Sequence, residues 1–166
     1  TTEQIDSFYS LNMNNFKLNE NLVKYRYIKV PKDNININRI RRYIVRVNEQ
    51  DRYFLDSLNF QFADIKLNDS TWFTERDVIS SINFINQNNK ANYFIKDRLF
   101  SIEESNYINF FIVDDILISG NIPPISYLYE RIKSLIINQR KLNLLKNINK
   151  EILNDALISK KYEVYK

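Results

Sequence analysis

Histidine and cysteine are both absent from this sequence of 166 residues, and glycine occurs only once. Without histidine there is no Ser-His or Cys-His nucleophilic pair and no imidazole base, and most kinds of zinc site are excluded. Without cysteine there are no disulfides, iron–sulfur clusters or thiol redox reactions. A single glycine excludes a GxGxxG dinucleotide loop and a phosphate-binding P-loop. We therefore expect neither a cofactor nor a bound metal.

Long apolar runs are also missing, although apolar residues are plentiful. Hydrophobic residues make up 44% of the chain, enough for the core of one domain or of one domain with an appendage. No stretch of 18 apolar residues occurs, so the sequence predicts no transmembrane segment. The chain opens on Thr1 with no initiator Met and no visible signal peptide, which we interpret as a fragment or a processed form.

Positive charge is concentrated near the C-terminus. The formal net charge is +4. Residues 121–166 hold nine Lys or Arg and four Asp or Glu, whereas residues 1–120 hold 15 Lys or Arg and 16 Asp or Glu. A basic segment of this kind is compatible with binding to nucleic acid or to an anionic membrane surface. Because the charges are spread among Asn residues and not clustered, we favour a solvated helix face.

Hydrophobic periodicity predicts a mixture of helices and strands. Alternating β-branched and aromatic residues predict strands over 22–30, closed by Pro31, and over 107–113, with 116–118 continuing or pairing with the latter. Apolar residues at helical spacing predict helices over 1–15, 35–48 and 51–62. Residues 77–84 are expected to form a short helix or turn, 86–90 a loop, and 99–102 a short strand.

The C-terminal third is dominated by one long helix. The single glycine, Gly120, lies just before the pair Pro123-Pro124, which is a helix start signal. Apolar residues then recur to about residue 159, which predicts a helix of ~35 residues and ~50 Å. Its apolar stripe needs a partner, for which the 1–15 helix is the candidate, covering Leu142 and Leu145. Residues 162–165 are expected to add a terminal strand.

Two acidic pairs, Glu103-Glu104 and Asp114-Asp115, are candidates for acid–base chemistry. Neighbouring residues of a strand point to opposite faces, so neither pair converges on a substrate. We interpret both pairs as solubilising residues at turns and strand ends.

Arginines and one aromatic pair are the remaining candidates for binding. Arg39, Arg42 and Arg46 share one helix face and could grip phosphates, although a solvated outer face is favoured because the opposite side is accounted for as core. Trp72-Phe73 in a polar loop is either a ligand platform or a plug for a small core, and the plug is favoured.

Several short sequence words resemble those of parvulin-type peptidyl-prolyl isomerases, in the arrangement of the SurA-like and PpiC-like periplasmic folding factors. The words Phe8-Tyr9 and Phe16-Lys17-Leu18 resemble the helix that precedes the family's first strand. That strand reads Arg-His-Ile-Leu-Val, and residues 26–30 read Arg-Tyr-Ile-Lys-Val. The last strand reads His-Ile-Ile-Lys-Val, and residues 109–113 read Asn-Phe-Phe-Ile-Val. The family's Leu-Gly-Trp-Phe word remains only as Trp72-Phe73, and residues 58–63 and 123–124 resemble two further family words.

The resemblance implies a proline-binding pocket with an altered polar pair. Ile79 and Phe84 are at the positions where a Met and a Phe line the family's pocket. Both family histidines are replaced, by Tyr27 and Asn109, and the Gly-rich turn is missing. The Cys or Asp that faces the pocket has Asp69 as its nearest counterpart. Prolyl isomerisation breaks no bond, and a pocket that desolvates the twisted amide lowers its barrier. We therefore expect retained peptide binding with weak or no isomerase activity.

The sequence as a whole thus predicts an α+β protein. Residues 22–119 are expected to form a degenerate parvulin-like domain with a small antiparallel sheet, and the flanking segments 1–21 and 120–166 to pack together as helices. The predicted peptide-binding residues are Tyr27, Trp72, Ile79, Phe84 and Asn109, around one concave site. The expected partners are unfolded or extended polypeptide clients or an envelope partner protein, and the expected location is the periplasm or cell envelope. An active isomerase with an altered site, and a basic nucleic-acid-binding domain using residues 131–150, are the alternatives.

Overall fold

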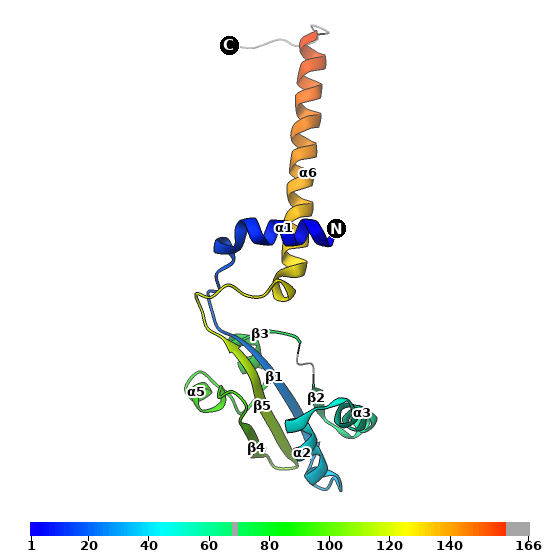
Figure 1. Ribbon diagram of the computed structural model, residues 1–166, viewed down its shortest axis with the longest axis vertical. Helices are drawn as coiled ribbons and strands as arrows, with labels where there is room; N and C mark the ends of the chain where they lie inside the picture. The colour runs from blue at the N-terminus through cyan, green and yellow to red at the C-terminus, as the bar shows by residue number, and fades with distance from the viewer. Residues whose placement is uncertain (68–69, 159–166) are drawn as a thin grey trace. The chain divides into compact units, whose positions relative to one another are not determined.

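The computed structural model describes residues 1–67 and 70–158, and the chain divides into two compact units (Figure 1). One unit holds residues 17–122 and contains the sheet. The other combines residues 1–16 with the chain from Pro123 onward. The predicted α+β class, with a small antiparallel sheet and a long C-terminal helix, is confirmed. The predicted strand at 162–165 and the candidate Asp69 lie outside the described residues.

The sheet is built around two long central strands, β1 (Leu22–Pro31) and β5 (Tyr107–Leu117). They pair antiparallel, with Arg26 opposite Ile112, which confirms the prediction that they lie side by side. The strand order is β2-β1-β5-β4, and β3 also pairs with β1. The strands β2 (Asp64–Lys66) and β3 (Phe73–Thr74) lie where the sequence predicted loop, whereas β4 (Leu99–Glu103) matches a predicted strand. Strands of two or three residues carry too little alternation to be recognised.

Two helices cover one face of the sheet, as predicted (Figure 1). Helix α2 (Ile37–Arg46) is shorter than expected because Val47 adopts a left-handed conformation with φ of 40° and its N–H bonds to the carbonyl of Tyr43. Helix α3 (Glu49–Ser57) begins earlier than expected and is followed by a short 3₁₀ helix, η2 (Asn59–Gln61). The buried side chains of this face are Ile28, Val30, Ile40, Ile44, Leu55, Phe110 and Ile112.

The opposite face is covered by α4 (Glu75–Ser81) and α5 (Lys90–Tyr93). Helix α4 starts earlier than predicted because Thr74 caps it, with the Thr74 hydroxyl accepting a bond from the N–H of Asp77 at 3.1 Å. Val78 and Ile82 are fully buried against this face. The predicted loop 86–90 gives way to α5 at Lys90.

Asp114 is not a solubilising strand end, contrary to the interpretation from the sequence. It is the extra residue of a β-bulge in β5, because the pairing of β1 with β5 shifts register between Lys24 and Tyr25. Its carboxylate accepts bonds from Nε of Arg26 at 2.8 and 3.0 Å. The same guanidinium donates to the carbonyls of Ile44 and Val45 at the end of α2. The bulge therefore positions an ion pair that ties α2 to the sheet.

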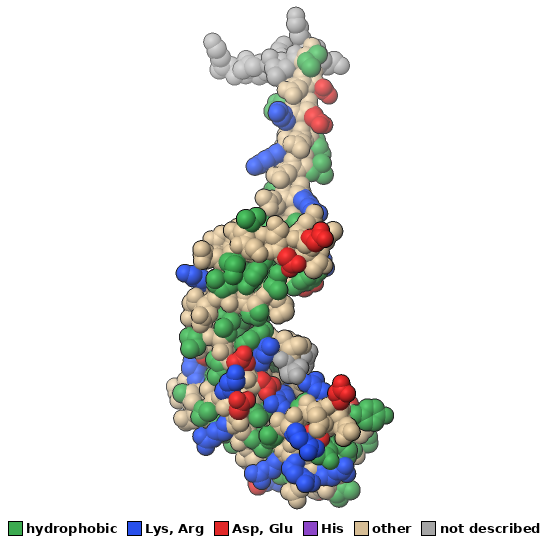
Figure 2. Space-filling model, in the orientation of Figure 1, with side chains coloured by type: hydrophobic (Ala, Val, Ile, Leu, Met, Phe, Trp, Pro, Cys, Tyr) green, Lys and Arg blue, Asp and Glu red, His purple; other side chains and the backbone are tan. Residues whose placement is uncertain are grey.

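The second unit consists of α1 (Thr2–Asn12), the 3₁₀ helix η1 (Met13–Phe16) and α6 (Ile125–Ile158). The predicted packing of the N-terminal helix on the C-terminal helix is confirmed, with Ile5, Phe16, Leu128 and Ile132 forming a buried cluster. The prediction that it covers Leu142 and Leu145 is wrong, since these are 60% and 56% exposed. Figure 1 shows α1 crossing α6, so it covers a few turns only, and the outer part of α6 stands uncovered in Figure 2. None of the described helices is long and apolar enough to cross a membrane.

Candidate functional site

A buried tyrosine–asparagine pair lies on the sheet face that α4 and α5 cover. Tyr27 of β1 lies opposite Phe111, and Asn109 lies two residues away from Phe111 along β5. The Tyr27 hydroxyl donates to Oδ1 of Asn109 at 2.7 Å. Tyr27 is 4% exposed and Asn109 is not exposed at all. The prediction that these two side chains meet is confirmed.

The pair belongs to a polar network that reaches the surface on one side. Nδ2 of Asn109 donates to the carbonyl of Ile102 at 3.3 Å. Glu104 accepts a bond from Nζ of Lys29 at 2.9 Å, and this bond, together with one to Asn109, holds the pKa of Glu104 below its usual range. Burial raises the pKa of Tyr27 far above that of an ordinary phenol, and the carboxylates of Asp64 and Glu104 act in the same direction. At neutral pH the Tyr27 phenol is therefore protonated and the pair is uncharged.

Half-buried apolar side chains lie over this pair. The Phe84 ring is edge-on to Tyr93, with centroids 5.3 Å apart, and to the buried Phe111, at 6.2 Å. Tyr93 is in turn edge-on to Phe100, at 5.1 Å. We call this set the outer layer: Phe73, Ile79, Phe84, Tyr93 and Phe100, all partly exposed and all packed on the same core cluster. The outer layer packs on the core cluster that contains Tyr27 and offers a partly exposed, largely aromatic surface.

The structure brings four of the five predicted site residues to one face. Tyr27, Ile79 and Phe84 share a core cluster, and Asn109 bonds to Tyr27. Trp72 is the exception. Its ring lies 4.7 Å from Nζ of Lys24, and Lys24 stands in β1 between Val23 and Tyr25, which both belong to that cluster. Successive strand residues point to opposite faces, so Trp72 lies on the other side.

Two further residues of this face, Tyr25 and Lys66, were not among the site residues predicted from the sequence. Tyr25 is 1% exposed, and its ring packs on Phe73 with centroids 5.1 Å apart. Nζ of Lys66 donates to the Tyr25 hydroxyl at 3.0 Å and lies over the Phe73 ring at 5.8 Å. Burial raises the pKa of the Tyr25 phenol, against an opposing effect of Lys66. Tyr25 shares a predicted strand face with Tyr27, so alternation alone identifies it, whereas Lys66 lies in a three-residue strand with no such signal.

The site holds no group of His, Cys, Asp and Glu side chains suited to a metal within residues 1–67 and 70–158. Of the carboxylates near Tyr27, that of Glu104 is paired with Lys29. The arrangement offers apolar contacts, ring edges and faces, and one ammonium group at Lys66. Apolar side chains and ring faces of this kind are the groups against which apolar or ring-bearing ligands pack.

Comparisons with known proteins give one distant structural likeness. No protein-family model matches the sequence, and no curated protein matches it. A chain from a study of the virulence factor PEB4 and the periplasmic protein Cj1289, two structurally related SurA-like chaperones of Campylobacter jejuni, aligns with a TM-score of 0.38 and 12% sequence identity. The alignment spans all of this chain and 64% of the matched chain. The function proposed next rests on the geometry of the site and not on this likeness.

Proposed function

We propose that residues 22–119 form a peptide-binding domain that holds extended or proline-containing segments of unfolded or partner polypeptides against the outer layer. The proposal rests on one arrangement: partly exposed rings pack on the core cluster that contains Tyr27, and the Tyr27 hydroxyl is itself occupied by a 2.7 Å bond to Asn109. A bound segment meets Phe84 and Tyr93 and does not reach Asn109, which is fully buried. Binding then depends on the apolar layer and not on the polar pair.

Catalysis of prolyl isomerisation is weak or absent in this proposal. An isomerase must favour the twisted amide over both planar forms, and equal binding of the ground states lowers no barrier. The Tyr27 phenol is already committed to Asn109, and its raised pKa keeps it protonated. No polar group of the pair is thus available to the twisted amide, whereas one proline or phenylalanine ring buried on the outer layer contributes ~1.5–3 kcal/mol to binding.

The proposed setting is the bacterial envelope, where a folding factor meets chains before they fold. This setting follows from the resemblance of the sequence words to SurA-like and PpiC-like proteins. An active isomerase with an altered site and a nucleic-acid-binding domain remain the competing hypotheses. The second of these predicts binding that falls steeply with salt, because counterions are released from phosphates.

Two assays on the same protein test the proposal. Exchange NMR on a short prolyl peptide measures isomerisation, and fluorescence anisotropy with a labelled unfolded peptide measures binding. We expect no measurable acceleration of exchange, and binding that Phe84→Ala weakens about tenfold while Tyr27→Phe leaves it unchanged. Phe60→Ala is the matched control, because Phe60 is 83% exposed in the same unit and outside the outer layer.

Three outcomes would contradict the proposal. Family-like turnover by the pure protein supports the active isomerase. Peptide binding unaffected by Phe84→Ala shows that the outer layer is not the binding surface. Binding to nucleic acid but to no peptide supports the basic-domain hypothesis.

A further inference from the structure

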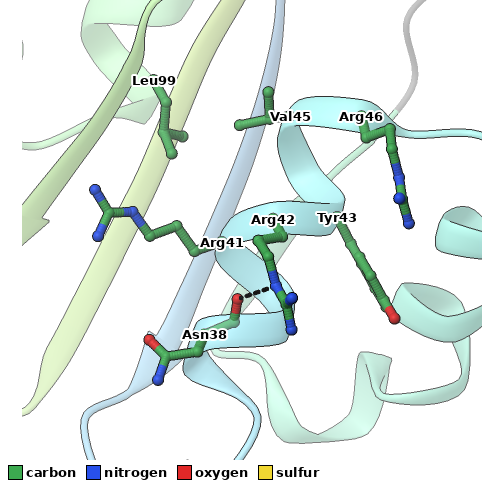
Figure 3. Close-up of a pocket in the computed structure, with 7 residues that line it drawn as sticks. All are labelled: Asn38, Arg41, Arg42, Tyr43, Val45, Arg46 and Leu99. Atoms are coloured by element: carbon green, nitrogen blue, oxygen red, sulfur yellow. Dashed lines mark hydrogen bonds between the residues drawn. The ribbon is translucent and has the colours of Figure 1, made fainter.

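A second surface lies on the opposite face of the sheet, between α2 and the edge strand β4. It is a hollow of about 890 Å³. It is lined by Leu99 of β4 and by six residues of α2: Asn38, Arg41, Arg42, Tyr43, Val45 and Arg46 (Figure 3). Figure 3 shows the Arg41 side chain extending from α2 toward the strand that carries Leu99. The hollow therefore combines apolar walls with guanidinium groups.

The arginines of α2 differ in how they are paired. Arg46 donates to both carboxylate oxygens of Asp51, at 2.8 and 2.7 Å, and Arg39 stacks on the Phe54 ring at 4.0 Å. Arg42 donates only to the carbonyl of Asn38, at 3.4 Å. Within the part of the chain that the structure describes, the Arg41 side chain forms no hydrogen bond or ion pair. Of the three guanidiniums that line the hollow, those of Arg41 and Arg42 have no carboxylate partner, and Figure 2 shows Lys and Arg side chains gathered over this region.

The hollow is bordered by an open sheet edge. Strand β4 is the last in the order β2-β1-β5-β4. One of its edges is hydrogen-bonded to β5, and its other edge has no neighbouring strand in this sheet. The N–H of Glu104 donates to the carbonyl of Tyr107. Because successive residues of a strand direct their backbone groups to opposite edges, this bond shows which residues of β4 are hydrogen-bonded to β5. The N–H and C=O groups of Leu99, Ser101 and Glu103 consequently point away from β5. Such a row of backbone groups is a template for one further strand.

We propose that this edge binds an extended, acidic polypeptide segment as an additional strand. The segment's backbone pairs with the outward groups of Leu99 and Ser101, and its carboxylates on one face bond to Arg41 and Arg42. Arginine favours carboxylates because its planar fork matches their geometry. At the other end of β4 lies the Glu103 carboxylate, which pairs with Lys32 at 3.1 Å. Its negative charge repels acidic residues, so the acidic residues of the bound segment lie toward Leu99.

A polypeptide fits this surface better than a nucleic acid. A strand edge presents alternating donors and acceptors at the spacing of another polypeptide backbone, and a phosphate backbone offers acceptors only. The walls formed by Tyr43, Val45 and Leu99 suit aliphatic side chains of the same segment. This surface lies on the other face of the sheet from Phe84, so it binds independently of the proposed function.

The test compares two labelled peptides in fluorescence anisotropy, one alternating Glu with Val and one with Gln in place of every Glu. We expect the acidic peptide to bind at least tenfold more tightly at low salt, and Arg41→Gln and Arg42→Gln each to weaken it about tenfold. Arg76→Gln, an exposed arginine of α4 on the other face, is the matched control. Phe84→Ala leaves this binding unchanged, which separates this proposal from the proposed function.

The edge itself is tested with Ser101→Pro. Proline removes an N–H that points away from β5, so the ladder between β4 and β5 stays intact and binding falls about tenfold. Amide exchange of the unchanged protein gives a second measure, in which the acidic peptide protects the N–H groups of Leu99, Ser101 and Glu103. Equal binding of the two peptides, or no amide protection, overturns the proposal. An oligothymidylate that binds through Arg41 and Arg42 and is unaffected by Ser101→Pro also overturns it.

Discussion

Removing the Tyr27 hydroxyl tests the structure of the site most directly. Tyr27→Phe deletes the donor of a 2.7 Å bond and leaves the fully buried Oδ1 of Asn109 without it. A buried polar group that loses its partner costs ~1–3 kcal/mol, so we expect the free energy of unfolding to fall by that amount. Asn109→Leu alone leaves the Tyr27 hydroxyl without its acceptor and costs a similar amount, while the Ile102 carbonyl keeps its backbone partner in the β4–β5 ladder.

The double variant distinguishes a bond from simple packing. When both partners become apolar, neither polar group is stranded at this contact, so the double variant loses less than the sum of the single losses. We expect a coupling free energy of about 1 kcal/mol or more.

Urea unfolding followed by fluorescence gives these values for the sheet unit alone, because the single tryptophan, Trp72, lies within residues 17–122. Strict additivity, or a Tyr27→Phe loss below ~0.5 kcal/mol, would refute the buried bond. The denaturant slope m provides the control, since an unchanged slope shows that the variants alter stability and not the extent of unfolding.

Three further results are expected. Asp114→Asn leaves the buried Arg26 charge without its carboxylate and destabilises the protein by ~3 kcal/mol in urea unfolding. The neighbouring Asp115→Asn, whose partner Lys96 is exposed, has a much smaller effect, and equal losses would contradict this. Bonds from Arg46 hold the pKa of Asp51 below its usual range, so the stability that this carboxylate contributes is present above pH ~4 and is lost as the pH falls further. Asp51→Asn should therefore make the melting temperature depend less on pH in this acid range, and an unchanged dependence on pH would contradict the reasoning. Ile132→Ala should cost ~2–5 kcal/mol as a fully buried residue between α1 and α6, and an equal loss from the exposed Leu142→Ala would be inconsistent with the structure.

Much of the fold was predictable because its signals are local. The ten-residue alternation of β1 and the apolar repeat of α6 are each long enough to reveal their period. Thr1, Pro31 and the pair Pro123-Pro124 mark where segments start or stop by fixing or capping the backbone next to them. The meeting of Tyr27 and Asn109 was also predictable, but through the resemblance of the two strand words and not through periodicity.

Tertiary structure alone decided what those local signals leave open. Alternation assigns a residue to a face but does not say what covers that face, so the exposure of Leu142 and Leu145 depends on α1 crossing α6 and not running along it. The face of Trp72 depends on β3, whose two residues pair with β1 across a long stretch of sequence. The bond of Arg26 to the end of α2 depends on a bulge at Asp114 that shifts the register of β5. Each of these is a long-range contact, and the free energy that selects it comes from burial and pairing between distant segments, which no short window of sequence contains.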